Sequence, residues 1–149
     1  MTKASIRVNS NTVYEIEVND NGDVISMDPA DLNLYDNIYR MMDTIKNAEK
    51  QFNDESKEIE QLEESDEKTR KQVKCMIRYF NKGRKAIDLV YGEGAADKIF
   101  GKTNHIEMFD MFFEQMEPHM EKIGVNITEY QKRLVAKYGN RKARRNVLS

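Results

Sequence analysis

The first part of the chain alternates between apolar and polar residues with a period of two. Residues 5–9 and residues 12–18 both show this pattern, which is typical of half-buried β-strands. An Asn-Gly pair at positions 21–22 is a strong signal for a tight hairpin turn, and residues 23–27 form a third alternating stretch after it. We therefore predict a three-stranded β-meander over residues 4–28.

From residue 29 onward, apolar residues instead recur at spacings of three and four, which predicts amphipathic α-helices. Asp28 is expected to cap the first of these helices, with Pro29 at its first helical position. Residues 51–71 are almost entirely polar, so a helix there has no apolar face to bury. The pattern indicates either a protruding antiparallel helix pair or a partly frayed connection.

A run of helix boundary signals follows the second long helical pattern. Residues 95–100 are expected to form a short helical turn, which Gly101 ends as a left-handed residue. Asn104 and Glu107 have the spacing of a capping box and should begin the next helix, which covers residues 105–123.

The last signals predict one more helix. Gly124 is expected to end the preceding helix, and Asn126 to cap a final helix that Gly139 stops. The predicted fold is mainly α (α+β): a small N-terminal three-stranded β-meander followed by four to five helices, including a long charged helical hairpin. The predicted organisation is a single domain over residues 1–140, with the meander at 4–28 and the helices at 29–140, and a basic flexible tail at 141–149.

A Gly-Lys-Thr triplet at residues 101–103 superficially matches a phosphate-binding loop. That loop normally starts with Gly and follows a buried strand, because its backbone N–H groups must wrap around the phosphates. Here Ala96 stands at the first position, Asp97 adds a negative charge, and the preceding residues continue a helical period. We therefore do not expect an NTPase.

The high fraction of charged residues favours long exposed helices over a compact enzyme. Of the 149 residues, 39% are hydrophobic and 34% charged, and the single cysteine excludes an intrachain disulfide. No signal peptide or membrane-spanning stretch is evident, so we expect a cytoplasmic protein. Residues 1–69 carry a net charge of −10 and residues 70–149 one of +8. These halves can attract within one molecule or align neighbouring copies head to tail.

Candidate catalytic and metal-binding residues are few. His105 and His119 lie about 20 Å apart if they share one helix, too far to bind one metal ion. Cys75 stands near Lys74 and Arg78, which could lower its pKa, but a buried helical cysteine is the commoner case. We expect no catalytic site, no metal and no cofactor.

Two features are candidates for partner binding. The helix over 105–123 carries a broad apolar face, which is either ordinary core, the default interpretation, or a docking face for a partner helix. The C-terminal tail is basic and is expected to be flexible by itself; an acidic protein surface is the next interpretation, and nucleic acid the last. The candidate partner-binding residues are Phe109, Phe112, Phe113, Met116, Arg141, Lys142, Arg144 and Arg145.

The strongest resemblance to a known family lies in residues 90–101, VYGEGAADKIFG, together with MFDMFF at 108–113. These segments resemble the FGEG…KIFG…FFE pattern of siphophage and prophage proteins of Gram-positive bacteria, which are often taken for tail assembly chaperones. Tyr91 stands where the pattern has Phe. The resemblance covers most of the chain, and its motif is structural.

This resemblance implies a non-enzymatic chaperone that binds the phage tape measure protein and tail tube components during tail morphogenesis, and that self-associates in the host cytoplasm. The alternative that the residues leave open is an oligomeric helical structural or adaptor protein. Its basic C-terminal tail would contact nucleic acid or an acidic protein partner.

Overall fold

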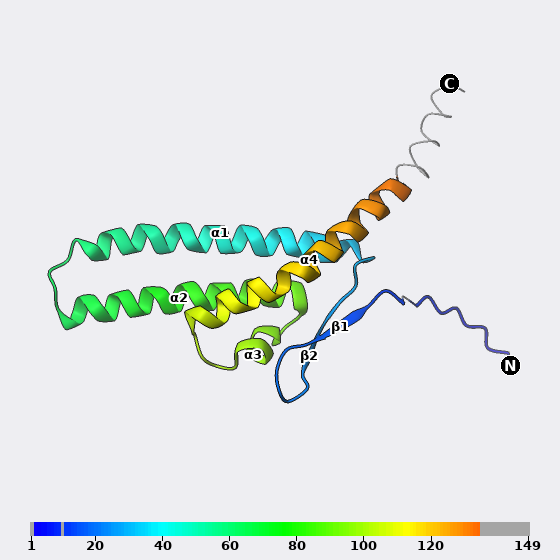
Figure 1. The fold of residues 1–149 in the computed structure, drawn as a ribbon, viewed down its shortest axis with the longest axis horizontal. Helices are drawn as coiled ribbons and strands as arrows, with labels where there is room; N and C mark the ends of the chain where they lie inside the picture. The colour runs from blue at the N-terminus through cyan, green and yellow to red at the C-terminus, as the bar shows by residue number, and fades with distance from the viewer. Residues whose placement is uncertain (1, 10, 135–149) are drawn as a thin grey trace, which may run out of the picture.

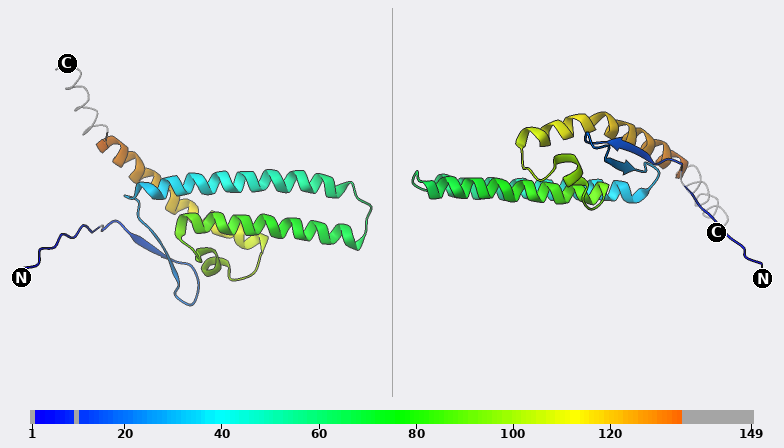
Figure 2. Two further views of the ribbon diagram at one scale, coloured as in Figure 1. Left: turned by 180° about the vertical axis from the view of Figure 1, so that it is seen from behind. Right: turned by 90° about the horizontal axis from the view of Figure 1, so that it is seen from below.

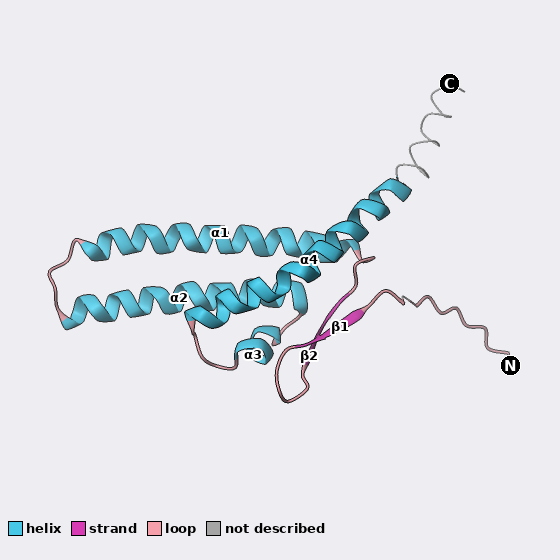
Figure 3. Cartoon of the chain, viewed as in Figure 1, coloured by secondary structure: helices cyan, strands magenta, loops and turns pink. Residues whose placement is uncertain are grey.

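The computed structural model describes residues 2–9 and 11–134, and this part of the chain is mostly helical, as predicted (Figures 1 and 3). Two layers make up the fold. Helices α1 and α2 form one layer, and α4 crosses it diagonally as the second, with α3 and the β-strands beside it (Figure 2). The elements in chain order are β1 (Tyr14–Glu17), β2 (Val24–Met27), α1 (Leu32–Glu60), α2 (Asp66–Tyr91), α3 (Ala95–Phe100) and α4 (Ile106–Leu134).

The strands β1 and β2 form a two-stranded antiparallel sheet, in which Ile16 pairs with Ile25. The turn at the Asn-Gly pair was predicted correctly, and Gly22 adopts a φ of +82° that suits glycine. The first of the three predicted strands, over residues 5–9, is wrong, because that segment has no regular secondary structure and does not pair with β1. Its alternation predicted a strand, but strand formation also requires a neighbouring strand to hydrogen-bond with.

The first helix begins later than predicted. Its N-cap is Asp31, whose carboxylate accepts a hydrogen bond from the Asn33 N–H at 2.9 Å. Asp28 instead stabilises the preceding turn, where its carboxylate accepts from the Ala30 N–H at 3.0 Å. Asp28 and Asp31 both have a carboxylate that can cap a helix. The Asp28 carboxylate stabilises the turn that contains Pro29, and the Asp31 carboxylate caps α1.

Helices α1 and α2 run antiparallel and pack side by side along their length (Figure 1). Ser65 caps α2 by accepting a hydrogen bond from the Lys68 N–H at 3.2 Å. The Lys68 ammonium group donates to the Glu60 carbonyl at 3.3 Å and to the Glu64 carboxylate at 2.6 Å. Lys68 therefore satisfies the last carbonyl of α1 and joins the two helices across their connection.

The end of α3 agrees with prediction, while α4 differs from it. Helix α3 stops at Gly101, whose φ is +66°. Helix α4 begins at Ile106, so Asn104 is not its N-cap. The predicted break at Gly124 is also wrong, because α4 continues through that position to Leu134. A glycine inside a helix costs only about 1 kcal/mol, which is too little to end it without competing structure.

The core lies where the two layers meet. Gly83 of α2 lets α4 approach closely, since a Cβ at this position would lie 3.4 Å from the Phe109 ring. The aromatic rings of Phe80, Phe100 and Phe109 pack together there, with the last two stacked at a centroid distance of 4.2 Å. The buried core residues are Ile25, Met27, Leu34, Met41, Phe80, Ala86, Ile87, Val90, Ala95, Ala96, Phe100, Phe109 and Met116.

Candidate functional site

An apolar groove with a volume of about 930 Å³ lies between α1 and α4. One wall comes from the first half of α1 and the other from the middle of α4, while Tyr91 at the end of α2 also lines it. Its apolar lining consists of Tyr35, Ile38, Tyr39, Met41, Met42, Ile45, Tyr91, Phe112, Phe113, Met116 and Met120.

The groove exposes large apolar side chains on both walls. On α1, Tyr39 is 68% exposed and Met42 is 56% exposed, and on α4 Phe113 is 40% exposed. Tyr39 and Met42 are three positions apart, so they lie on one face of α1 beside the strip that packs into the core. Exposed apolar side chains gathered at one groove are typical of a binding surface.

The apolar floor of the groove has a polar rim that is mainly acidic. Asp43, Glu49 and Glu117 contribute three carboxylates, and Lys46 contributes one ammonium group. Methionine and aromatic side chains make contact with apolar partners without strict geometric demands, because methionine is flexible and aromatic rings offer a large area. The arrangement suits an apolar segment that also carries basic residues.

Tyr35 is held in place at the end of the groove. Its hydroxyl donates a hydrogen bond to the Pro29 carbonyl. Burial raises the pKa of the Tyr35 phenol, and the nearby Asp28 carboxylate raises it further. The phenol therefore stays protonated at neutral pH and fixes the start of α1 against the preceding turn.

The candidate apolar face of α4 is divided between the core and the groove. Phe109 and Met116 are buried in the core, which agrees with the default interpretation. Phe112 is half-buried and contacts the rings of Tyr91 and Phe100 edge-on, with centroids 6.2 and 5.6 Å away. Phe113 is the most exposed of the four. The four basic tail candidates, Arg141, Lys142, Arg144 and Arg145, lie outside the described residues.

The contribution of α1 to the groove was not predicted. The sequence places two apolar residues side by side twice, at Ile38-Tyr39 and at Met41-Met42. Adjacent apolar residues make the apolar strip of α1 wider than packing on a single neighbouring helix requires. These pairs were therefore a signal that α1 has a second apolar surface.

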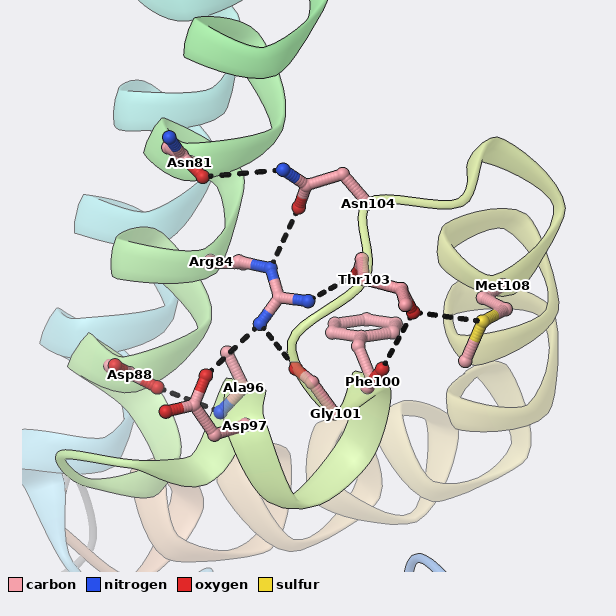
Figure 4. Close-up of polar contacts among 10 residues, drawn as sticks. All are labelled: Asn81, Arg84, Asp88, Ala96, Asp97, Phe100, Gly101, Thr103, Asn104 and Met108. Atoms are coloured by element: carbon pink, nitrogen blue, oxygen red, sulfur yellow. Dashed lines mark hydrogen bonds and ion pairs between the residues drawn. The ribbon is translucent and has the colours of Figure 1, made fainter.

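The Gly-Lys-Thr segment is held by Arg84 of α2 (Figure 4). The Arg84 guanidinium donates hydrogen bonds to the Gly101 carbonyl at 2.8 Å, to the Thr103 carbonyl, and to the Asn104 side-chain oxygen at 2.9 Å. It also pairs with Asp97 at 3.1 Å. A phosphate loop presents N–H donors to its ligand, whereas these carbonyl groups face a cation. The segment is thus a structural corner between α3 and α4.

The other candidates for chemistry do not form a site. Cys75 is buried, and burial raises the pKa of its thiol, with a further contribution from the Glu55 carboxylate. Burial and the raised pKa both disfavour the thiolate form that a reactive cysteine requires. His105 precedes α4 and His119 lies within it. Within the described part of the chain, no three His, Cys, Asp or Glu side chains are arranged to hold a metal ion.

None of the helices in the described residues combines the length and the apolar character needed to cross a membrane. A family model described as "Family of unknown function (DUF6673)" matches residues 21–147. Neither the curated proteins nor the solved structures contain a match to this chain.

Proposed function

The chain belongs to this family of unknown function, and we propose that it is a non-enzymatic phage tail assembly chaperone. In this role it binds the tape measure protein and tail tube components during tail morphogenesis. The proposal combines the groove between α1 and α4 with the resemblance of residues 90–113 to phage tail proteins.

The observation that carries the proposal is the exposure of Tyr39, Met42 and Phe113 on the two walls of one groove. These side chains are costly to leave in water, so a partner that covers them gains the hydrophobic contribution that their burial supplies. Two helices with a gap between them accept a third helix, which lays its apolar face into the groove. By the resemblance to phage tail chaperones, this third helix is a long apolar helical segment of the tape measure protein, which the chain keeps soluble before assembly.

The acidic rim adds a preference for the partner's charge. Asp43 and Glu117 lie on opposite walls of the groove, and each can approach a basic side chain that flanks the bound apolar face. Charges at the rim of an interface mainly affect the rate of association and the choice of partner. We therefore expect binding to weaken modestly as salt concentration rises, while apolar contacts supply most of the affinity.

The test is co-expression of the chain with the tape measure protein of the same phage or prophage. The wild-type chain should raise the soluble fraction of that protein and elute with it. The double variant Tyr39→Glu, Met42→Glu should lose both effects, because it places two charges on the apolar wall of α1.

A matched control is available on α2. Val73 and Ile77 are also exposed apolar residues on a long helix, but they do not line the groove. The double variant Val73→Glu, Ile77→Glu should keep the partner soluble as well as the wild-type chain does. Equal loss in both double variants would reject the groove as the binding site, and no effect of the wild-type chain on solubility would reject the chaperone function.

A further inference from the structure

The N-terminal segment extends away from the body of the molecule (Figures 1 and 2). Its two large apolar side chains, Ile6 and Val8, are 93% and 92% exposed, more than any other large hydrophobic residue in the described part of the chain. Both are β-branched and they stand two positions apart, as in a strand with one apolar face. The segment therefore has the sequence of a strand without a strand partner.

The outer edge of β1 offers the complementary backbone groups. The Val18 N–H donates to the Asp23 carbonyl at 2.9 Å, so this pair belongs to the hydrogen-bonded positions of the antiparallel ladder. Hydrogen-bonded and non-bonded pairs alternate, so the N–H and C=O groups of Glu15 and Glu17 point away from β2. Among the described residues, none hydrogen-bonds to these outward groups.

We propose that residues 3–9 of one copy of the chain add as a strand to the outer edge of β1 in a second copy. Two strands form a sheet of marginal stability, and a third strand improves it. In the described structure, residues 3–9 do not turn back onto β1 of their own chain, which leaves the edge open to another copy.

The side chains of the donor segment and of β1 are complementary on both faces of such a sheet. Residues of even number in the donor, Ile6 and Val8, would join the face of Ile16 and Val18, which is packed partly against the core. Residues of odd number would join the exposed face of Glu15 and Glu17. The basic residues among them are Lys3 and Arg7, so opposite charges meet across the new pair.

The edge of β2 is the poorer acceptor. By the same alternation, the outward backbone groups of β2 belong to Val24, whose side chain is half-buried, and to Ser26, and β2 contacts α2. The outward backbone groups of β1, in contrast, belong to two residues with exposed side chains. Each copy thus has one donor segment and one acceptor edge, so the exchange closes as a dimer or continues as a chain of copies.

The experiment compares three variants of the full chain by light scattering. The wild-type chain should have at least twice the monomer mass at high protein concentration. The donor variant Ile6→Asp, Val8→Asp and the acceptor variant Glu17→Pro should both be monomers. Proline at residue 17 removes one outward N–H group and leaves the bonds to β2 in place. The control Ser26→Pro makes the same change on the outer edge of β2 and should associate as the wild type does.

Mixing the two monomeric variants distinguishes the loss of one strand-pairing surface from misfolding of the whole chain. The donor variant keeps an intact β1 edge, and the acceptor variant keeps an intact N-terminal segment. An affinity-tagged donor variant should therefore retain the untagged acceptor variant, whereas neither variant should retain an untagged copy of itself. Absence of retention in the mixture, a monomeric wild type, or equal loss of association in Ser26→Pro would overturn the proposal. The groove variant Tyr39→Glu, Met42→Glu should still associate, so this test is independent of the chaperone proposal.

Discussion

The pair of long helices is stabilised in two different ways along its length. At its base, where α1 begins and α2 ends, α3, α4 and the β-strands pack against it and bury the core cluster. At its tip, residues 51–78, the pair is largely exposed, and its buried side chains are Ile59, Lys68 and Cys75. The base therefore depends on apolar burial, while the tip depends on caps, polar contacts and a few apolar contacts.

This difference explains why a polar helical segment persists without a core around it. Isolated helices are marginal in water, and tertiary packing normally stabilises them. The tip has the other α-helix as its neighbour, and its connection is fixed by Ser65 and Lys68. We expect the base to determine global stability and the tip to open locally at a lower free energy.

The largest effect is expected at the base, from Phe109→Ala. The Phe109 ring contacts Phe80 at 4.8 Å and Phe100 at 4.2 Å between centroids. Its removal leaves a cavity between the layers, so the free energy of unfolding should fall by about 3–5 kcal/mol. Urea denaturation measures this, with Phe113→Ala as the matched control on the same helix. A comparable loss in the control, whose side chain is 40% exposed, would contradict the assignment of the core.

An intermediate effect is expected at the tip, from Lys68→Met. This variant keeps an unbranched apolar side chain but removes the ammonium group that donates to the Glu60 carbonyl. The cost should be about 1–2 kcal/mol, because a charge-assisted hydrogen bond is lost at a partly buried group. Hydrogen exchange should increase at the end of α1 and the start of α2 and remain unchanged at the base. An increase that spreads through the core cluster instead would show that base and tip unfold together.

The smallest effect is expected from Glu55→Gln, on the exposed side of the tip. The Glu55 carboxylate accepts a hydrogen bond from Arg78 at 2.6 Å, and this contact lowers its pKa. A carboxyl group with a lowered pKa in the folded state stabilises the protein above its unfolded pKa and loses that effect as the pH falls.

The variant should therefore unfold at a slightly lower urea concentration than the wild type at about pH 7, and the difference should shrink as the pH falls through the lowered pKa of Glu55. Arg78→Gln provides the matched control, because it removes the same pair from the other side. If the difference in urea midpoint between the wild type and Glu55→Gln grows as the pH falls, the Glu55–Arg78 pair is not the cause of that difference.

Local signals in the sequence predicted much of the architecture, because they depend on residues close together in the chain. The Asn-Gly turn, the end of α3 at Gly101 and the mostly helical character all follow from local backbone preferences and from hydrophobic periodicity. The N-cap was wrongly assigned to Asp28 because Asp31, three residues later, offers the same capping carboxylate. The helix end was wrongly assigned to Gly124 because a single glycine is too weak a signal to end α4.

Only the tertiary structure decided how the apolar faces were divided. Phe109 and Phe113 are four positions apart on one face of α4, yet the first is buried against α2 and α3 and the second lies at the groove. Periodicity identifies an apolar face but not which part of it another helix covers, because that depends on the crossing of α4 over the pair. The sequence by itself determined the helices and their apolar faces, and the packing of those helices determined which faces remained open.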